Sequence, residues 1–228
     1  MPPERWERLG AATGIVFAVV AAVGLFIAPL PPDPGAPASE IAGYFTENRD
    51  RVLIQVWTLG LAGVFFLWFL GSLRSYLRAA EGEPGRLSAV VFGAGIAAFA
   101  SFGTGTGLAG ALAHSVAEQG GLEVTLAFER LAQLALAGTG FPLFVLLAAA
   151  SLVSGRTKAL PAWLGWLGWA LAALALVSSL AVFFDEGALA PGGIVGVVLF
   201  AAFVVWFLAA SLVMVGRVGR DSRPTRRD

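Results

Sequence analysis

Residues 87–114 read LSAVVFGAGIAAFASFGTGTGLAGALAH, an apolar stretch with no charged side chain. Within it, Gly105, Gly107 and Gly110 spell G-x-G-x-x-G, the pattern of a dinucleotide-binding loop. That loop works where a β-strand delivers it to a helix N-terminus, whose free N–H groups meet the pyrophosphate. Here the apolar run continues on both sides, and a turn inside a bilayer would expose unpaired backbone groups. The stretch therefore predicts a membrane-spanning helix and no nucleotide site.

Small residues in this stretch recur at a spacing that places them on one helix face. Such strips let a neighbouring helix approach closely in a membrane. We therefore expect the third span to lie inside the bundle and to pack there, or against a partner protein, through its small residues. Two strips have a four-residue spacing: Gly103, Gly107 and Ala111, and Ser101, Gly105 and Ala109.

The composition of the whole chain agrees with a membrane protein. Of its 228 residues, 57% are apolar and only 13% are charged, about half the charged fraction of a soluble domain. There is no cysteine and only one histidine, His114. Disulfides, iron–sulfur clusters and sites built from several imidazoles are thereby excluded, and we expect neither a metal site nor a cofactor.

A spanning helix needs about 20 mostly apolar residues to cross a hydrocarbon core of about 30 Å. Six segments qualify, and clusters of proline, glycine and charge separate them. The sequence thus predicts an all-α membrane bundle of six helices that forms a single domain over residues 1–228. The predicted spans are residues 9–30, 52–73, 87–113, 125–153, 163–184 and 193–215, and a basic tail follows at 216–228.

Basic residues predict the orientation of the bundle. They concentrate before the first span, in the second and fourth loops and in the tail, whereas the other side has only Arg49, Arg51 and Arg130 among many acidic residues. The positive-inside rule then places both termini in the cytoplasm, which requires an even number of spans. We expect a multi-pass protein of the bacterial inner (plasma) membrane. A cleaved signal peptide at the first span is the alternative, but its apolar run exceeds a signal core of about 7–15 residues.

A group of polar residues is predicted to meet on the outer side of the bundle. His114 closes the third span, and Glu129, Arg130 and Gln133 stand in the first turns of the fourth. Glu129 and Gln133 share a helix face, and a helical hairpin brings His114 toward Glu129. The pair is a candidate acid–base couple, proton relay or weak metal site. The simpler interpretation is a carboxylate favoured by a helix N-terminus, an arginine that reaches the headgroups and a wet histidine.

Two further features bear on a possible cavity. Gly138, Gly140 and Pro142 lie close together in the fourth span, and a proline inside a helix predicts a kink that can line a cavity or serve ordinary packing. The segment 38–48 of the first outer loop predicts a short amphipathic helix capped by Ser39, with Ile41 on its apolar face. That helix is either a lid over the bundle or, as we favour here, an interfacial anchor.

Three motifs resemble those of uncharacterised bacterial six-helix integral membrane proteins of actinobacteria-like genomes. They are SEIAGYFTENRDRVLIQ at 39–55, LPAWLGWLGW at 160–169 and WFLAASLVMVGR at 206–217. The resemblance implies the six-helix architecture and carries no catalytic residues.

For function, we expect a non-enzymatic membrane subunit or interaction protein that contacts the bilayer and a membrane partner or further copies of itself. Nucleic acid is not expected, because the basic tail is short. Two alternatives stay open. One is a transporter or sensor of a small molecule with an outward-facing cavity beside the fourth helix. The other is a membrane enzyme that uses Glu129 and His114.

Overall fold

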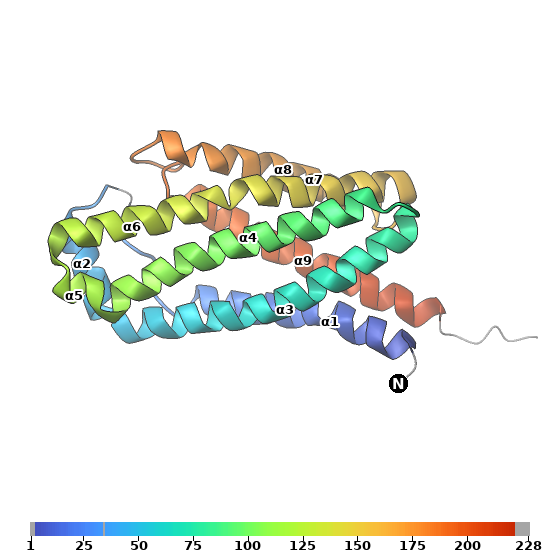
Figure 1. Cartoon of the computed structure of the whole chain (residues 1–228), viewed down its shortest axis with the longest axis horizontal. Coiled ribbons are helices and arrows are strands. Elements are labelled where there is room, and N and C mark those ends of the chain that lie inside the picture. Colours follow the sequence, from blue (N-terminus) through green and yellow to red (C-terminus); the bar gives the residue numbers. More distant parts are fainter. Residues whose placement is uncertain (1–2, 34, 222–228) are drawn as a thin grey trace, which may run out of the picture.

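In the part of the chain that the structure describes, six helices are long and apolar enough to cross a membrane. The computed structural model describes residues 3–33 and 35–221, and the helices of this part run side by side along one long axis (Figure 1). No strand occurs among these described residues. The predicted six-helix membrane bundle is confirmed. The spanning helices are α1 (Pro3–Leu25), α3 (Arg49–Glu81), α4 (Arg86–Ala111), α6 (Gly121–Gly138) continued by α7 (Gly140–Thr157), α8 (Ala162–Ser178) and α9 (Ile194–Asp221).

Shorter helical pieces complete the end of the bundle opposite the start of α1 (Figure 1). α2 (Ala38–Glu47) belongs to the loop between α1 and α3. A π-helical turn, η1 (Leu112–Val116), and α5 (Ala117–Gln119) extend α4, and a 3-10 turn, η2 (Ser179–Phe183), extends α8. We call this end the α2 end and the opposite one the basic end, because Arg74, Arg78 and Arg156 belong to the helix ends and turns there.

Turn residues define the helix ends at the basic end. Gly82 follows α3 with φ of 81° and donates its N–H to the carbonyl oxygen of Arg78 at 2.9 Å. This positive φ suits glycine, which has no Cβ to clash. The Glu81 carboxylate then accepts hydrogen bonds from the backbone N–H groups of Leu87 and Ser88, each at 2.9 Å. This carboxylate accepts from N–H groups of the first turn of α4 that have no partner within the helix. The positive end of the helix dipole stabilises its negative charge.

The spanning helices form a closed ring in chain order. Each spanning helix packs beside the next one in the sequence, from α1 through α3, α4, α7 and α8 to α9, and α9 packs against α1. The hydroxyl of Ser211 on α9 donates to the carbonyl oxygen of Ala11 on α1 at 2.5 Å, so a buried hydrogen bond joins the first and last helices. Neighbours in sequence are thus neighbours in space, as short connections favour.

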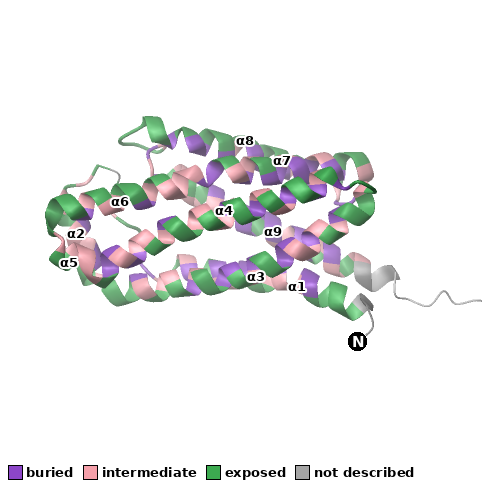
Figure 2. Ribbon diagram, viewed as in Figure 1, coloured by how far each residue is buried: buried purple, intermediate pink, exposed green. Residues whose placement is uncertain are grey.

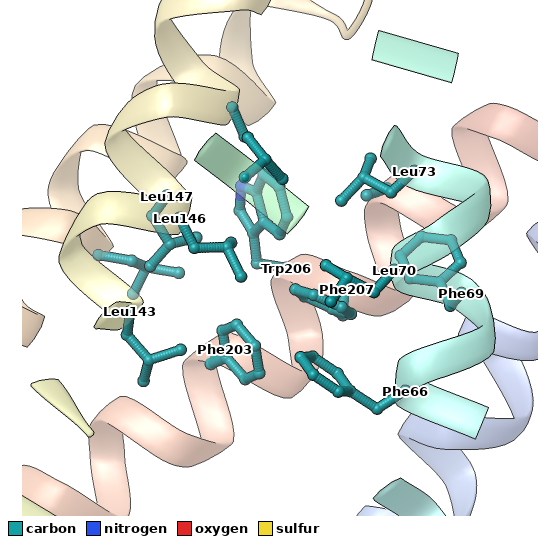
Figure 3. Packing of buried hydrophobic residues seen from close by; sticks show 14 of the residues in the cluster. Phe66, Phe69, Leu70, Leu73, Leu143, Leu146, Leu147, Phe203, Trp206 and Phe207 are labelled. Atoms are coloured by element: carbon teal, nitrogen blue, oxygen red, sulfur yellow. The ribbon is translucent and has the colours of Figure 1, made fainter. Parts of the chain in front are cut away.

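Phenylalanine side chains fill the centre of the ring (Figure 3). Phe17 of α1, Phe66 of α3, and Phe203 and Phe207 of α9 are all at most 5% exposed. Their rings are 4.5 Å apart, centroid to centroid, for Phe203 and Phe207, and 5.2 Å for Phe66 and Phe207. Aromatic pairs at such distances contribute about 0.5–1.5 kcal/mol each beyond the area they bury. Beside them, Trp206 donates its indole N–H to the carbonyl oxygen of Leu164 at 3.0 Å.

The outer surface of the bundle is itself apolar, and exposed residues run along the length of its helices (Figure 2). Val19, Trp57, Phe141 and Val205 are each 57% exposed or more. In water such a surface would be an aggregation hazard, whereas lipid chains are as apolar as these side chains. The exposed surface therefore supports a membrane protein as strongly as the helix lengths do.

The glycine strips of α4 lie differently from our prediction. Gly103 and Gly107 are exposed, and a Cβ built at either one would have no neighbour within 4 Å. At Gly105, by contrast, a Cβ would lie 2.6 Å from Cγ of Leu136 and 2.9 Å from the carbonyl oxygen of Ala132. The expectation that the strip with Gly103 and Gly107 packs within the chain's own bundle is therefore wrong. α4 also does not lie inside the bundle, because it is one member of the ring of helices. The strip with Gly105 makes the close contact, with α6.

Three smaller predictions also need correction. α1 ends at Leu25, five residues before the predicted end of the first span, since prolines follow at 29, 31 and 32. α2 begins directly after Pro37, so Ser39 lies in its first turn and forms no cap. α9 continues to Asp221, into the predicted tail, whose residues 222–228 lie outside the described part.

α2 packs on the protein. Its Ile41 and Phe45 are 6% exposed, in a cluster with Ala28, Leu112 and Ala113. The interfacial-anchor interpretation of segment 38–48 is thereby replaced by a helix that covers the end of the bundle.

Candidate functional site

A cavity of about 270 Å³ lies near the α2 end of the bundle, among α2, α3, α4, α6, α7, α9 and the loop that precedes α9. Its volume is near the lower limit of ligand sites, which hold about 300–1,000 Å³. No charged side chain is among its lining residues in the described part of the chain. Six side chains bring hydroxyl or carboxamide groups to the wall: Tyr44, Gln55, Thr106, Gln133, Thr139 and Ser178.

The break between α6 and α7 forms part of the cavity wall. α6 ends at Gly138, α7 begins at Gly140, and Thr139 between them is buried in the wall. Pro142 has no N–H, so the helical hydrogen bond that the carbonyl oxygen of Gly138 would accept from residue 142 does not form. The interruption at Thr139 thus lies among Gly138, Gly140 and Pro142, where the sequence predicts a kink. Both Thr139 and Gly140 face the cavity.

Gly140 also lets the start of α7 approach α8. A Cβ at this position would lie 2.5 Å from the carbonyl oxygen of Ala175 and 3.1 Å from Cβ of Ser179. Backbone approach this close is the role of small residues in membrane helices. The start of α7 is therefore held against α8 beside the cavity.

α2 lies over the outer side of the cavity. Tyr44 and Phe45 of this helix line the wall, and the Tyr44 hydroxyl donates to the carbonyl oxygen of Pro29 at 2.8 Å. Burial raises the pKa of the Tyr44 phenol, so the group stays protonated and remains a donor at neutral pH. The hydrogen bond fastens α2 to the first residues of the segment after α1.

Gln133 reaches the cavity next to a glycine of the loop before α9. A Cβ at Gly192, where φ is 83°, would lie 2.8 Å from both Cδ and Oε1 of Gln133. The carboxamide therefore lies flat against the Cα of Gly192, and any larger residue there would displace it. Gln55 of α3, on another part of the wall, donates its Nε2 to the carbonyl oxygen of Gly24 at 3.0 Å.

A second, smaller hollow of about 50 Å³ lies toward the centre of the ring. Phenylalanine side chains dominate its wall: Phe17, Phe66, Phe99, Phe102, Phe200 and Phe203. Figure 3 shows Phe66 and Phe203 of this group, together with Leu143, around the middle of the bundle. Five residues line both hollows and therefore mark the boundary between them: Leu59, Phe102, Thr139, Leu143 and Phe200.

Only one member of the predicted polar group lines the cavity. Gln133 lines it, but His114, Glu129 and Arg130 line neither hollow. His114 is exposed in η1, within a helix that continues to Gln119 and so does not end at the histidine as expected. Glu129 is half-buried beside Gln133 and Arg130, and His114 is not among the groups that interact with its carboxyl. Among the described residues, no group of three or more metal-ligating side chains occurs.

Sequence reasoning missed Tyr44, Gln55, Thr106 and Gly192 as cavity residues. Gln55 could have been found, because an uncharged polar side chain within an apolar span needs a partner or a cavity. Thr106 gives no such indication, because hydroxyls in membrane helices commonly bond to their own helix. Tyr44 lies in a short helix outside the spans and Gly192 in a loop, where neither residue type indicates a cavity.

No family model, curated protein or solved structure matches this chain. Its function therefore has to be argued from the cavity and its chemistry.

Proposed function

We propose that the protein is a membrane transporter or sensor that binds a small, uncharged, largely apolar molecule in the cavity near the α2 end. The observation that carries this proposal is a cavity with a polar but uncharged wall beside the short interruption between α6 and α7. A wall with few polar groups among apolar ones is also the usual make-up of a small-molecule site.

The size of the cavity limits the ligand. An apolar cavity of about 150 Å³ holds one benzene molecule of six carbon atoms. At that ratio the cavity of about 270 Å³ holds roughly eleven non-hydrogen atoms. Decanol, with ten carbon atoms and one oxygen atom, has this size and is therefore a suitable probe of the cavity.

The test compares two alanine-to-phenylalanine variants of α6. Ala137 lines the cavity, so Ala137→Phe fills it, whereas Ala127 is exposed on the same helix and Ala127→Phe is the matched control. Each protein, in lipid nanodiscs, is exposed to decanol that carries a diazirine at mid-chain, and photolabelled peptides are mapped by mass spectrometry. We expect labelling of cavity peptides that excess decanol suppresses. It should fall about tenfold in Ala137→Phe and stay unchanged in Ala127→Phe; equal labelling of all three proteins would contradict the proposal.

We propose further that the basic end faces the cytoplasm of a bacterial plasma membrane, so that the cavity opens toward the outside. The support is the concentration of basic residues at that end. The chain has no cysteine, so one introduced cysteine reports its own side. A membrane-impermeant maleimide added to intact cells should label Asp185→Cys and leave Glu83→Cys unlabelled. The reverse pattern would invert the orientation.

The subunit role that we expected from the sequence is a second candidate. Gly103 and Gly107 are exposed on α4, with space for another helix above them. If that face binds a second copy, Gly107→Leu should lower energy transfer between two labelled copies in vesicles, and Gly93→Leu, an exposed glycine nearer the basic end, is a comparison variant. Unchanged transfer in Gly107→Leu would count against self-association through this strip.

A further inference from the structure

The two hollows share part of their walls. Phe102 of α4 and Phe200 of α9 line both hollows and stack with their centroids 5.2 Å apart and their planes 2° from parallel. Leu59 of α3, Thr139 between α6 and α7, and Leu143 of α7 line both hollows as well. We call this group of five residues the neck. A molecule that extends from one hollow into the other has to pass these side chains.

The two sides of the neck differ in chemistry. The outer cavity contains both carboxamides, of Gln55 and Gln133, and most of the hydroxyls. The inner hollow has one polar side chain, Thr139, and its remaining wall is aliphatic or aromatic. A molecule that occupies both hollows therefore has a polar group at one end and an apolar chain at the other.

The outer wall offers more hydrogen-bond acceptors than donors. The hydroxyl protons of Tyr44, Thr106 and Thr139 are each donated to a backbone carbonyl oxygen, at 2.8, 3.0 and 3.3 Å. Their oxygen lone pairs remain, as does Oε1 of Gln55, whose Nε2 is bonded to Gly24. A polar group that donates a hydrogen bond, such as a hydroxyl or an amide N–H, fits this wall better than one that only accepts.

The wall also disfavours charge in the ligand. No arginine or lysine lines the outer cavity in the described part of the chain, and the Glu129 carboxyl stands beside Gln133. A carboxylate or phosphate would therefore lose its water without gaining a cation. An ammonium group would find no carboxylate within the lining.

We propose that the ligand is an uncharged single-chain amphiphile with a hydroxyl or amide headgroup. Its headgroup lies between Gln55 and Gln133, and the end of its apolar chain passes the neck into the phenylalanine-lined hollow. That hollow of about 50 Å³ holds about two carbon atoms at about 25 Å³ per atom. This inference rests on the proposed function, since it names the ligand class and the orientation at the same cavity.

Two positional isomers of the photoreactive decanol test the orientation. A diazirine next to the hydroxyl should label peptides of α6 and of the loop before α9, around Gln133 and Gly192. A diazirine at the chain terminus should label peptides of α1, α3 and α9 around Phe17, Phe66 and Phe203. Identical labelling by the two isomers would overturn the orientation even if Ala137→Phe abolished both, in which case the binding site itself would stand.

A competition series tests the headgroup. Unlabelled decanol, decanamide, decane, decanoate and decylammonium compete with the photoreactive decanol. We expect decanol and decanamide to compete at least tenfold better than decane and the two ions. Equal competition by decane would show that no headgroup is recognised, and equal competition by either ion would show that charge is tolerated; each result overturns the proposed ligand class.

Variants at the headgroup end complete the test. Gln133→Leu keeps much of the volume and removes the carboxamide, so decanol should bind roughly fivefold to tenfold more weakly, while decane should be unaffected. Glu123→Gln, an exposed residue of α6 outside the lining, is the matched control and should leave decanol binding unchanged. If Gln133→Leu weakened decane as much as decanol, Gln133 would shape the cavity without contacting a headgroup.

Discussion

The packing of α4 against α6 gives the sharpest prediction, because two glycines two residues apart should behave in opposite ways. A Cβ at Gly105 would lie 2.6 and 2.8 Å from Cγ and Cδ2 of Leu136 and 2.9 Å from the carbonyl oxygen of Ala132. Carbon atoms in contact prefer about 3.5–4.0 Å, so Gly105→Ala has to displace a side chain and part of a helix backbone. A Cβ at Gly107 has nothing within 4 Å.

The expected energies follow from these distances. Overpacking of this kind costs about 1–3 kcal/mol. At Gly107 no such cost applies, and alanine is favoured over glycine within a helix by about 0.5–1 kcal/mol. We therefore expect Gly105→Ala to lower the free energy of unfolding and Gly107→Ala to leave it unchanged or raise it slightly. The propensity gain applies at both positions, so about 1–3 kcal/mol should separate the two variants.

Reversible unfolding in mixed micelles of increasing SDS fraction, followed by circular dichroism and tryptophan fluorescence, measures this difference. The double variant Gly105→Ala with Leu136→Ala should be less destabilised than the sum of the two single changes, because the leucine that the new methyl group displaces is then absent. If Gly107→Ala proved as destabilising as Gly105→Ala, α4 would be rotated about its axis relative to this structure, and the assignment of its faces would be wrong.

Three further predictions test other parts of the structure. The Ser151 hydroxyl is buried without a hydrogen-bond partner, so Ser151→Ala should raise the free energy of unfolding by about 1 kcal/mol in the same SDS titration; a loss of stability would reveal a partner. Tyr44→Phe removes the hydrogen bond to the carbonyl oxygen of Pro29 and should speed amide exchange in α2 about fivefold, which corresponds to a loss of about 1 kcal/mol in the local stability of α2. Exchange at the wild-type rate would show that the packing of α2 on the bundle does not depend on this bond. His114→Ala should leave decanol photolabelling unchanged because His114 lines neither hollow, and a loss of labelling would show that the histidine contributes to the site.

The span count was predictable because a bilayer imposes a length. About 20 apolar residues between clusters of proline, glycine and charge have few other stable arrangements. The break near Gly138 was predictable for a similarly local reason, since proline lacks the N–H that a helix interior needs. In both cases the cause lies within the segment itself.

The orientation of α4 was not predictable, because both sides of a membrane helix face apolar surroundings. In a soluble protein, water would select between the strip with Gly105 and the strip with Gly107. Here both strips have the same spacing and similarly small residues, so only the shape of α6, with Leu136 at the contact, decides between them. Single-sequence reasoning has no access to that shape.

The cavity was predictable only in part. Gln133 was identified, since a polar side chain in a span needs a reason. Its pairing with Gly192 depends on how the loop before α9 folds back, and its separation from His114 depends on the extra helical turns beyond Ala111. These are long-range facts that no local pattern encodes.

The hydrogen bond between Ser211 and Ala11 has a consequence for biosynthesis. During translation, α1 enters the bilayer long before α9 has been made, and until then the side of α1 that packs against α9 has no permanent neighbour. A chaperone or insertase that shields this side of α1 would therefore be released only when the final span arrives. A ribosome stalled before residue 194 should leave a nascent chain that stays bound to the insertion machinery.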